Sequence, residues 1–141
     1  MLDAYSFIDN SITSFEMYFA KVIEPQVLCD AIAKHLFLRR ENIGVVKLTQ
    51  IDSKETAVVL EELDGDFPLS VHIHTELAWL NMTEQELAQK LCATLNTQCL
   101  IAMDGSSTYS WLLVTASEFK MVSVDPEAFD GLCIFKIQVD C

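Results

Sequence analysis

Two apolar segments on either side of a turn constrain the fold of this chain more than any other feature. One covers residues 99–103 and the other residues 109–114, and Asp104, Gly105 and Ser106 lie in the turn between them. Continuous apolar runs of this length are typical of strands that are covered on both faces. Residues 98–124 therefore predict a hairpin at the centre of a sheet, which indicates a fold and not an activity.

Two other segments have the spacing of helices. Pro25 is tolerated as a first helical residue, and apolar residues recur behind it every three or four positions, which predicts a helix over residues 25–38. Thr83 and Glu86 match a capping box, and leucines repeat every four residues behind it. The second helix is therefore expected over residues 83–95.

The remaining elements are expected to be strands. Residues 14–22 alternate between apolar and other side chains, and three β-rich segments, 43–51, 56–63 and 67–75, are separated by turn sequences. Short links of this kind predict an antiparallel meander. With further strands at 119–124 and 133–139, the order is roughly β-α-βββ-α-ββββ. We expect one α+β domain over residues 1–141, with a mainly antiparallel sheet and both helices packed on one face.

Composition narrows the class of protein. Although 51% of the residues are hydrophobic, no stretch approaches the roughly 20 consecutive apolar residues that a membrane span needs. The N-terminal residues include an early acid and lack a secretory pattern, so a cytoplasmic location is expected. Five cysteines at irregular spacing, without a Cys-x-x-Cys pair, favour reduced thiols over a disulfide framework or a zinc ribbon.

The charge balance is strongly acidic. The net charge is −12 and the isoelectric point is near 4.4. A nucleic-acid-binding protein needs clustered Lys and Arg to replace the counterions around phosphates, so nucleic acid is not an expected partner. The same negative field would accelerate the encounter with a basic protein.

Candidate catalytic residues are few. His72 and His74 lie two residues apart on an expected strand, so both rings would project from one face and could share a metal ion. No third ligand is evident nearby, and two polar residues on the solvent face of a sheet are the simpler interpretation. The sequence has no nucleophile elbow and no glycine-rich phosphate loop, so we expect neither an enzyme nor a cofactor.

The acidic residues are segregated from the basic ones. Between residues 55 and 89 there are eight acids and no Lys or Arg. Like charges crowded around one turn cost stability unless something offsets them, and a basic partner would do so. A solvated loop kept acidic for solubility is the alternative. The predicted contact residues are Glu61, Glu62, Asp64, Asp66 and Phe67, extended by Asp104, Tyr109, Asp125 and Glu127.

Small size, strong acidity, a single α+β core and reduced cysteines together resemble the bacterial toxin-immunity proteins of contact-dependent growth inhibition systems. The resemblance is one of general character over the whole chain. It implies a cytoplasmic inhibitor that binds one cognate toxin domain, such as a nuclease with a basic cleft, and occludes it. The alternatives are a small metal-binding protein or enzyme centred on His72 and His74, and a non-catalytic scaffold or chaperone-like module.

Overall fold

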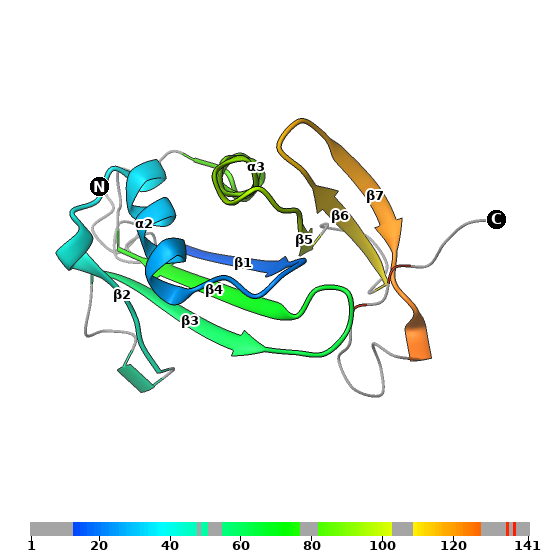
Figure 1. Ribbon diagram of the computed structural model, residues 1–141, viewed down its shortest axis with the longest axis horizontal. Helices are drawn as coiled ribbons and strands as arrows, with labels where there is room; N and C mark the ends of the chain where they lie inside the picture. The colour runs from blue at the N-terminus through cyan, green and yellow to red at the C-terminus, as the bar shows by residue number, and fades with distance from the viewer. Residues whose placement is uncertain are drawn as a thin grey trace, which may run out of the picture.

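The chain folds around one seven-stranded sheet (Figure 1). The computed structural model describes residues 13–47, 49–50, 55–76, 82–102, 109–127, 135 and 137. The strands follow one another across the sheet in the order β2-β3-β4-β1-β5-β6-β7. In chain order the elements are β1 (Thr13–Phe19), α2 (Pro25–Leu36), the 3-10 turn η1 (Arg40–Asn42), β2 (Ile43–Val45), β3 (Thr56–Glu62), β4 (Leu69–Thr75), α3 (Glu84–Leu95), β5 (Cys99–Ala102), β6 (Ser110–Val114) and β7 (Phe119–Ser123).

Local sequence signals set the ends of both helices. Thr83 Oγ1 accepts a hydrogen bond from Glu86 N at 3.1 Å, and Thr83 N donates to Glu86 Oε1 at 3.2 Å, so the predicted capping box of α3 is present. Pro25 occupies the first turn of α2. Each helix ends at a residue with left-handed backbone, Phe37 (φ 57°) or Asn96 (φ 53°).

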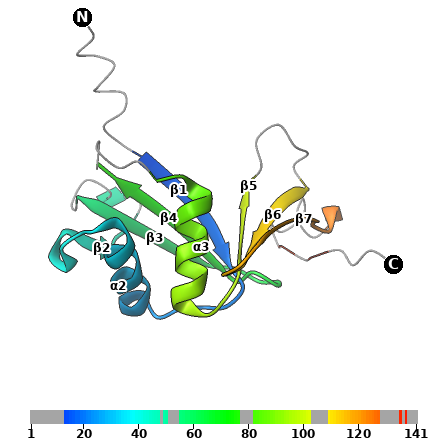
Figure 2. The ribbon, with the colours of Figure 1, turned by 90° about the horizontal axis from the view of Figure 1, so that it is seen from above.

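The two helices cover the same face of the sheet (Figures 1 and 2). The alternation predicted for β1 places Phe15, Met17 and Phe19 in the core beneath the helices, whereas Glu16 remains exposed. The predicted fold class, α+β with a mainly antiparallel sheet and helices on one face, is therefore confirmed.

A second, smaller cluster lies on the other face of the sheet. Phe67, Leu100, Val124 and Phe135 are its buried members. The segment that contains Phe135 reaches the β3–β4 turn, because Gly65 forms a bridge with Phe135 and Asp66 N donates to Phe135 O at 2.8 Å. Part of the face opposite the helices is thus covered by the chain itself.

Three details differ from the sequence-based expectations. β2 pairs with β3 in parallel and ends at Val45, so residues 43–75 do not form an antiparallel meander. β1 occupies the middle of the sheet, and the predicted central hairpin, β5 and β6, lies to one side of it. The last predicted strand is represented by single bridges at Phe135 and Ile137 within the described residues.

The sheet opens between β1 and β5. Their pairing is limited to Tyr18 with Leu100 and Phe19 with Cys99. Beyond this point the two strands diverge, as Figure 2 shows. This opening places Glu16 and Ala102, which the same register would pair two residues beyond Tyr18 and Leu100, on either side of a gap.

Candidate functional site

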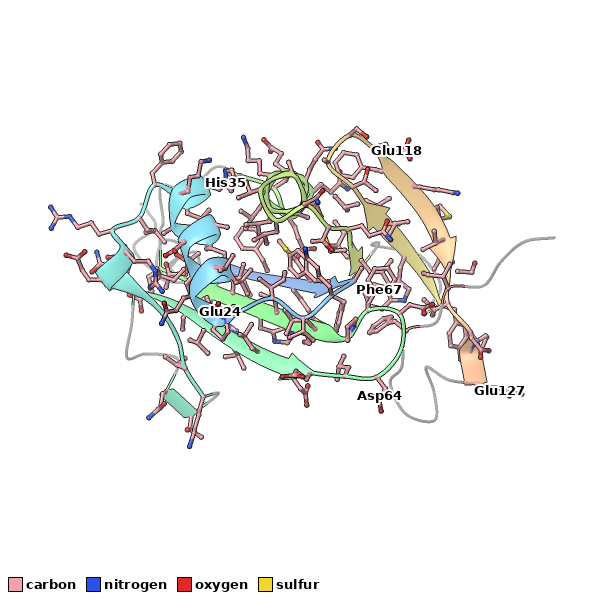
Figure 3. The ribbon with its side chains drawn as sticks, in the orientation of Figure 1. Glu24, His35, Asp64, Phe67, Glu118 and Glu127 are labelled. Carbon is pink, nitrogen blue, oxygen red and sulfur yellow. The ribbon has the colours of Figure 1, made fainter. Side chains whose placement is uncertain are left out.

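The β3–β4 turn and the end of β3 before it carry four exposed carboxylates, Asp66 among them. Gly65 supplies the left-handed backbone of the turn (φ 101°), and Leu63 N donates to Pro68 O at 2.7 Å. Glu61, Glu62 and Asp64 are exposed around it, and none of them forms an ion pair with a described Lys or Arg. Asp64 points away from the sheet in Figure 3. The turn therefore presents negative charge that no described Lys or Arg side chain pairs with.

The end of β7 joins this turn through one short segment. Gly65 forms a bridge with Phe135, and Val124 forms a bridge with Ile137 two residues further on. Asp66 Oδ2 accepts a hydrogen bond from Ile137 N at 3.0 Å. Two acidic stretches that are far apart in sequence thus meet at one end of the molecule. We call this surface the acidic end, and its members are Glu61, Glu62, Asp64, Asp66, Asp125 and Glu127.

The predicted contact residues differ in how well they are placed to meet a partner. Glu127 is exposed (Figure 3), whereas Asp125 is half-buried and its Oδ1 accepts a hydrogen bond from Glu127 N at 3.3 Å. Phe67 is only 2% exposed and belongs to the second core cluster, so its side chain is core and not surface. Tyr109 is half-buried and packs against that cluster. Asp104 lies outside the described residues.

Two arginines lie at the opposite end of the sheet. Arg39 and Arg40 follow α2, at the left of Figure 1, whereas the β3–β4 turn lies at the right. Arg40 Nε contacts Asp30 Oδ1 at 2.7 Å. The two arginines are therefore separated in space from the acidic end.

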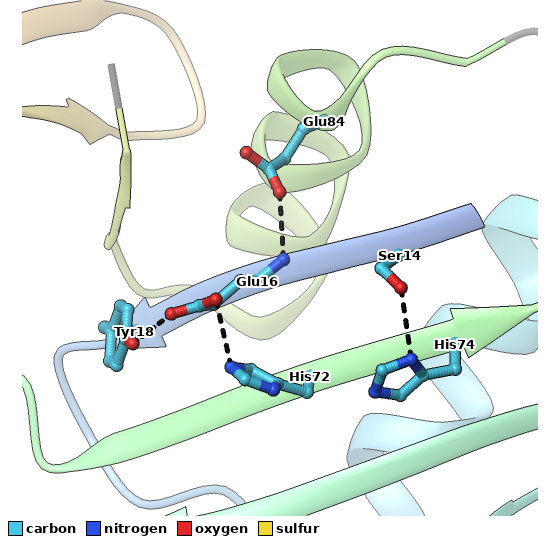
Figure 4. A network of polar contacts seen from close by, with 6 residues as sticks. All are labelled: Ser14, Glu16, Tyr18, His72, His74 and Glu84. Atoms are coloured by element: carbon cyan, nitrogen blue, oxygen red, sulfur yellow. Dashed lines mark hydrogen bonds and ion pairs between the residues drawn. The ribbon is translucent and has the colours of Figure 1, made fainter. Parts of the chain in front are cut away.

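A separate group of polar side chains surrounds the two histidines (Figure 4). His72 and His74 share one face of β4, with ring centroids 6.1 Å apart. His72 Nε2 lies 3.2 Å from Glu16 Oε2, and the hydroxyl of Tyr18 donates to Glu16 Oε1. On the far side, Ser14 Oγ and His74 Nδ1 are 3.1 Å apart. The polar face of β1 thus supplies a partner to each imidazole.

His74 has an unusual environment for an imidazole. Burial, followed by the nearby His72, lowers the pKa of His74 below its usual range, so the ring is neutral near pH 7. Its Nε2 atom is buried and has no hydrogen-bond partner among the described residues. A buried polar atom without a partner is uncommon and marks a place where a ligand or water can bind.

A cavity of about 370 Å³ adjoins this group. It lies where β1 and β5 diverge, near the first turn of α3. Its lining consists of Ser14, Phe15, Glu16, His72, His74, Glu84, Ala102 and Trp111. Side chains from five elements therefore meet around one opening in the sheet.

The described residues around the histidine pair do not form a metal centre. Within the described residues, no group of three or more His, Cys, Asp or Glu side chains is arranged to hold a metal ion. His72 Nε2 faces Glu16, and His74 Nδ1 faces Ser14. Two imidazoles alone do not complete the coordination shell of zinc.

Comparison with protein-family models, curated proteins and solved structures gives no significant match for this chain. In the part of the chain that the structure describes, neither α2 nor α3 is long and apolar enough to cross a membrane.

Sequence reasoning found the histidines but missed the residues around them. The alternation of β1 already places Ser14, Glu16 and Tyr18 on the face opposite the helices. The capping box likewise fixes Glu84 as the first residue of α3. What the sequence lacked was the pairing of β1 with β4, which sets Glu16 opposite His72.

Proposed function

We propose that this protein binds a basic partner protein through the acidic end, and that the partner is a toxin domain which it neutralises. The observation that supports binding is that Phe135 and Ile137 join the acidic β3–β4 turn to the acidic residues after β7. Carboxylates on adjoining segments, without an ion pair to a described Lys or Arg, raise the local negative potential, which increases the rate of encounter with a positive surface.

The backbone of the acidic end is well held. The backbone N of Asp66 donates a hydrogen bond to Phe135, and its carboxylate accepts one from Ile137. Phe67 anchors the same turn in the second core cluster. A surface that keeps its shape before binding loses less conformational entropy on association, which favours affinity.

The toxin part of the proposal depends on the resemblance to immunity proteins. A nuclease toxin has a basic cleft for phosphates, and carboxylates held on a rigid sheet can occupy such a cleft in place of phosphates. Inhibition would then follow from occlusion. The chain itself needs no catalytic group for this role.

Two experiments test the proposal. The gene next to this one should encode a large secreted protein with a toxin domain at its C-terminus, and that domain should co-purify with this chain. The variant Glu61→Lys, Glu62→Lys, Asp64→Lys should lose co-purification, because it reverses the exposed charges of the turn while leaving the hydrogen bonds of Asp66 intact.

A matched control variant distinguishes the effect of the acidic end on co-purification from the effect of net charge. Glu24, Glu55 and Glu76 are also exposed, and Glu55 and Glu76 lie at the opposite ends of β3 and β4 from the turn. Changing these three to Lys alters the net charge by the same amount and should leave co-purification intact. Equal co-purification of both variants with the toxin domain would exclude the acidic end as the contact surface.

A further inference from the structure

We propose that the cavity between β1, β4, β6 and the first turn of α3 binds an organic cation, that is, a guanidinium or alkylammonium group. The inference does not depend on the proposed function, because the cavity is distinct from the acidic end. Its volume of about 370 Å³ lies in the range of small-molecule sites. Its described lining includes two glutamates and a tryptophan, and no Lys or Arg.

The two carboxylates are fixed in place before any ligand arrives. Glu84 Oε2 accepts a hydrogen bond from the backbone N of Glu16 at 2.9 Å. Glu16 in turn is held by the hydroxyl of Tyr18 and by His72. A carboxylate oxygen can accept more than one hydrogen bond, so these contacts still leave Glu16 able to accept from a cation.

The opening in the sheet explains why these acids lie together. The N–H groups of even-numbered β1 residues point toward β5, as Ala20 N does when it donates to Gln98 O at 2.9 Å. At Glu16 the pairing with β5 has ended, and the carboxylate of Glu84 takes the place of the missing strand. A strand partner would have closed the space that the cavity occupies.

Trp111 gives the cavity an aromatic wall. Its ring packs at near right angles to Tyr18 (centroids 5.7 Å apart) and to Phe135 (4.9 Å), so its orientation is fixed by two neighbours. Guanidinium and ammonium groups bind favourably over the face of an indole ring through cation–π attraction. A tryptophan with carboxylates is therefore a combination suited to organic cations.

His74 supplies an acceptor for the same ligand. The ring is neutral near pH 7, because burial and the neighbouring His72 lower the pKa of His74. In the tautomer whose Nδ1–H donates to Ser14 Oγ, the buried Nε2 carries a lone pair without a partner among the described residues. An N–H of the bound cation would satisfy it.

The test is a titration of the whole protein, followed by NMR, with N-acetyl-L-argininamide and agmatine as probes. The first probe represents a basic side chain within a protein, and the second represents a small-molecule amine that is not part of a protein. Saturable shifts at Glu16, His74 and Trp111 are expected. Tighter binding of N-acetyl-L-argininamide would assign the cavity to a protein's side chain, and binding of agmatine alone would assign it to a free amine.

Two matched comparisons decide whether charge is recognised. N-acetyl-L-citrullinamide, the uncharged analogue, should bind the wild type about tenfold more weakly than N-acetyl-L-argininamide does, since charged hydrogen bonds are about twice as strong as neutral ones. For the same reason, N-acetyl-L-argininamide should bind the Glu84→Gln variant about tenfold more weakly than the wild type. The Glu84→Gln side chain keeps an oxygen that can accept the hydrogen bond from Glu16 N. The control variant is Glu118→Gln, on the exposed β6–β7 turn, and its affinity for the probe should equal that of the wild type. Absence of saturable binding, equal binding of the uncharged analogue, or an unchanged affinity in Glu84→Gln would overturn the inference. The Lys variant of the acidic end should bind the probes normally, which keeps this result separate from the proposed function.

Discussion

Replacing Phe67 with alanine tests whether this side chain at the acidic end belongs to the core or to the surface. The side chain is 2% exposed and packs with Leu100, Val124 and Phe135. Burial of a phenylalanine contributes about 1.5–3 kcal/mol, and the cavity left by its removal raises the cost to about 3–5 kcal/mol. Since domains of this size are stable by about 5–15 kcal/mol, Phe67→Ala should remove a large part of the free energy of unfolding.

Urea denaturation followed by circular dichroism measures this loss. The midpoint should fall strongly with little change in slope, whereas Asp64→Ala, three residues away and exposed, should alter the free energy of unfolding by less than about 0.5 kcal/mol. A loss below about 1 kcal/mol in Phe67→Ala would refute the assignment of this side chain to the core. Phe67 would then be available as the partner contact that the sequence indicated.

Other consequences of the structure can be measured on the purified protein. Thr83→Ala removes the cap of α3 and should lower the free energy of unfolding by about 1 kcal/mol in the same urea assay; no loss would contradict the capping box. The pKa values of His35 and His74 are lowered on folding, so the unfolded chain binds protons more readily and stability should fall as the pH drops below about 6.5. Urea midpoints at pH 7 and pH 5.5 should therefore differ less in His74→Gln than in the wild type, and an equal difference would count against a neutral His74. The thiols of Cys92 and Cys99 are fully buried with their sulfur atoms 3.6 Å apart, and the hydrogen bond with Cys92, followed by burial, raises the pKa of Cys99. Neither should react with Ellman's reagent until the protein is unfolded, and rapid labelling of the native protein would show that this part of the core is open.

Elements with strong local signals could be predicted from the sequence. The capping box fixed the start of α3, and the alternation of β1 fixed which of its side chains enter the core. These signals are local because they depend on hydrogen bonds and faces within one element.

Strand pairing could not be predicted in the same way. Residues 43–51 were expected to form one strand, but β2 ends at Val45, and the longer link that results allows β2 to run parallel to β3. The hairpin of β5 and β6 has the composition of a central element. It lies to one side because β1, from the start of the chain, pairs with both β4 and β5.

The candidate sites could not be predicted from the sequence either, because they depend on contacts between distant segments. Each acidic stretch was visible in the sequence, but their meeting depends on the bridges that Gly65 and Val124 make with Phe135 and Ile137. The cavity depends on Glu84 replacing a strand partner of Glu16, a contact between residues 68 positions apart. No local pattern encodes such a contact.

The most direct test of the proposed function is the rate at which the chain associates with its purified toxin domain, measured by stopped flow at low and high salt. Steering by the acidic end predicts that the wild-type rate falls as salt rises. It also predicts that the variant with Lys at positions 61, 62 and 64 associates at least about tenfold more slowly at low salt, while the matched control variant keeps most of the wild-type rate. Equal association rates for wild type and the acidic-end variant, with no dependence on salt, would contradict the account.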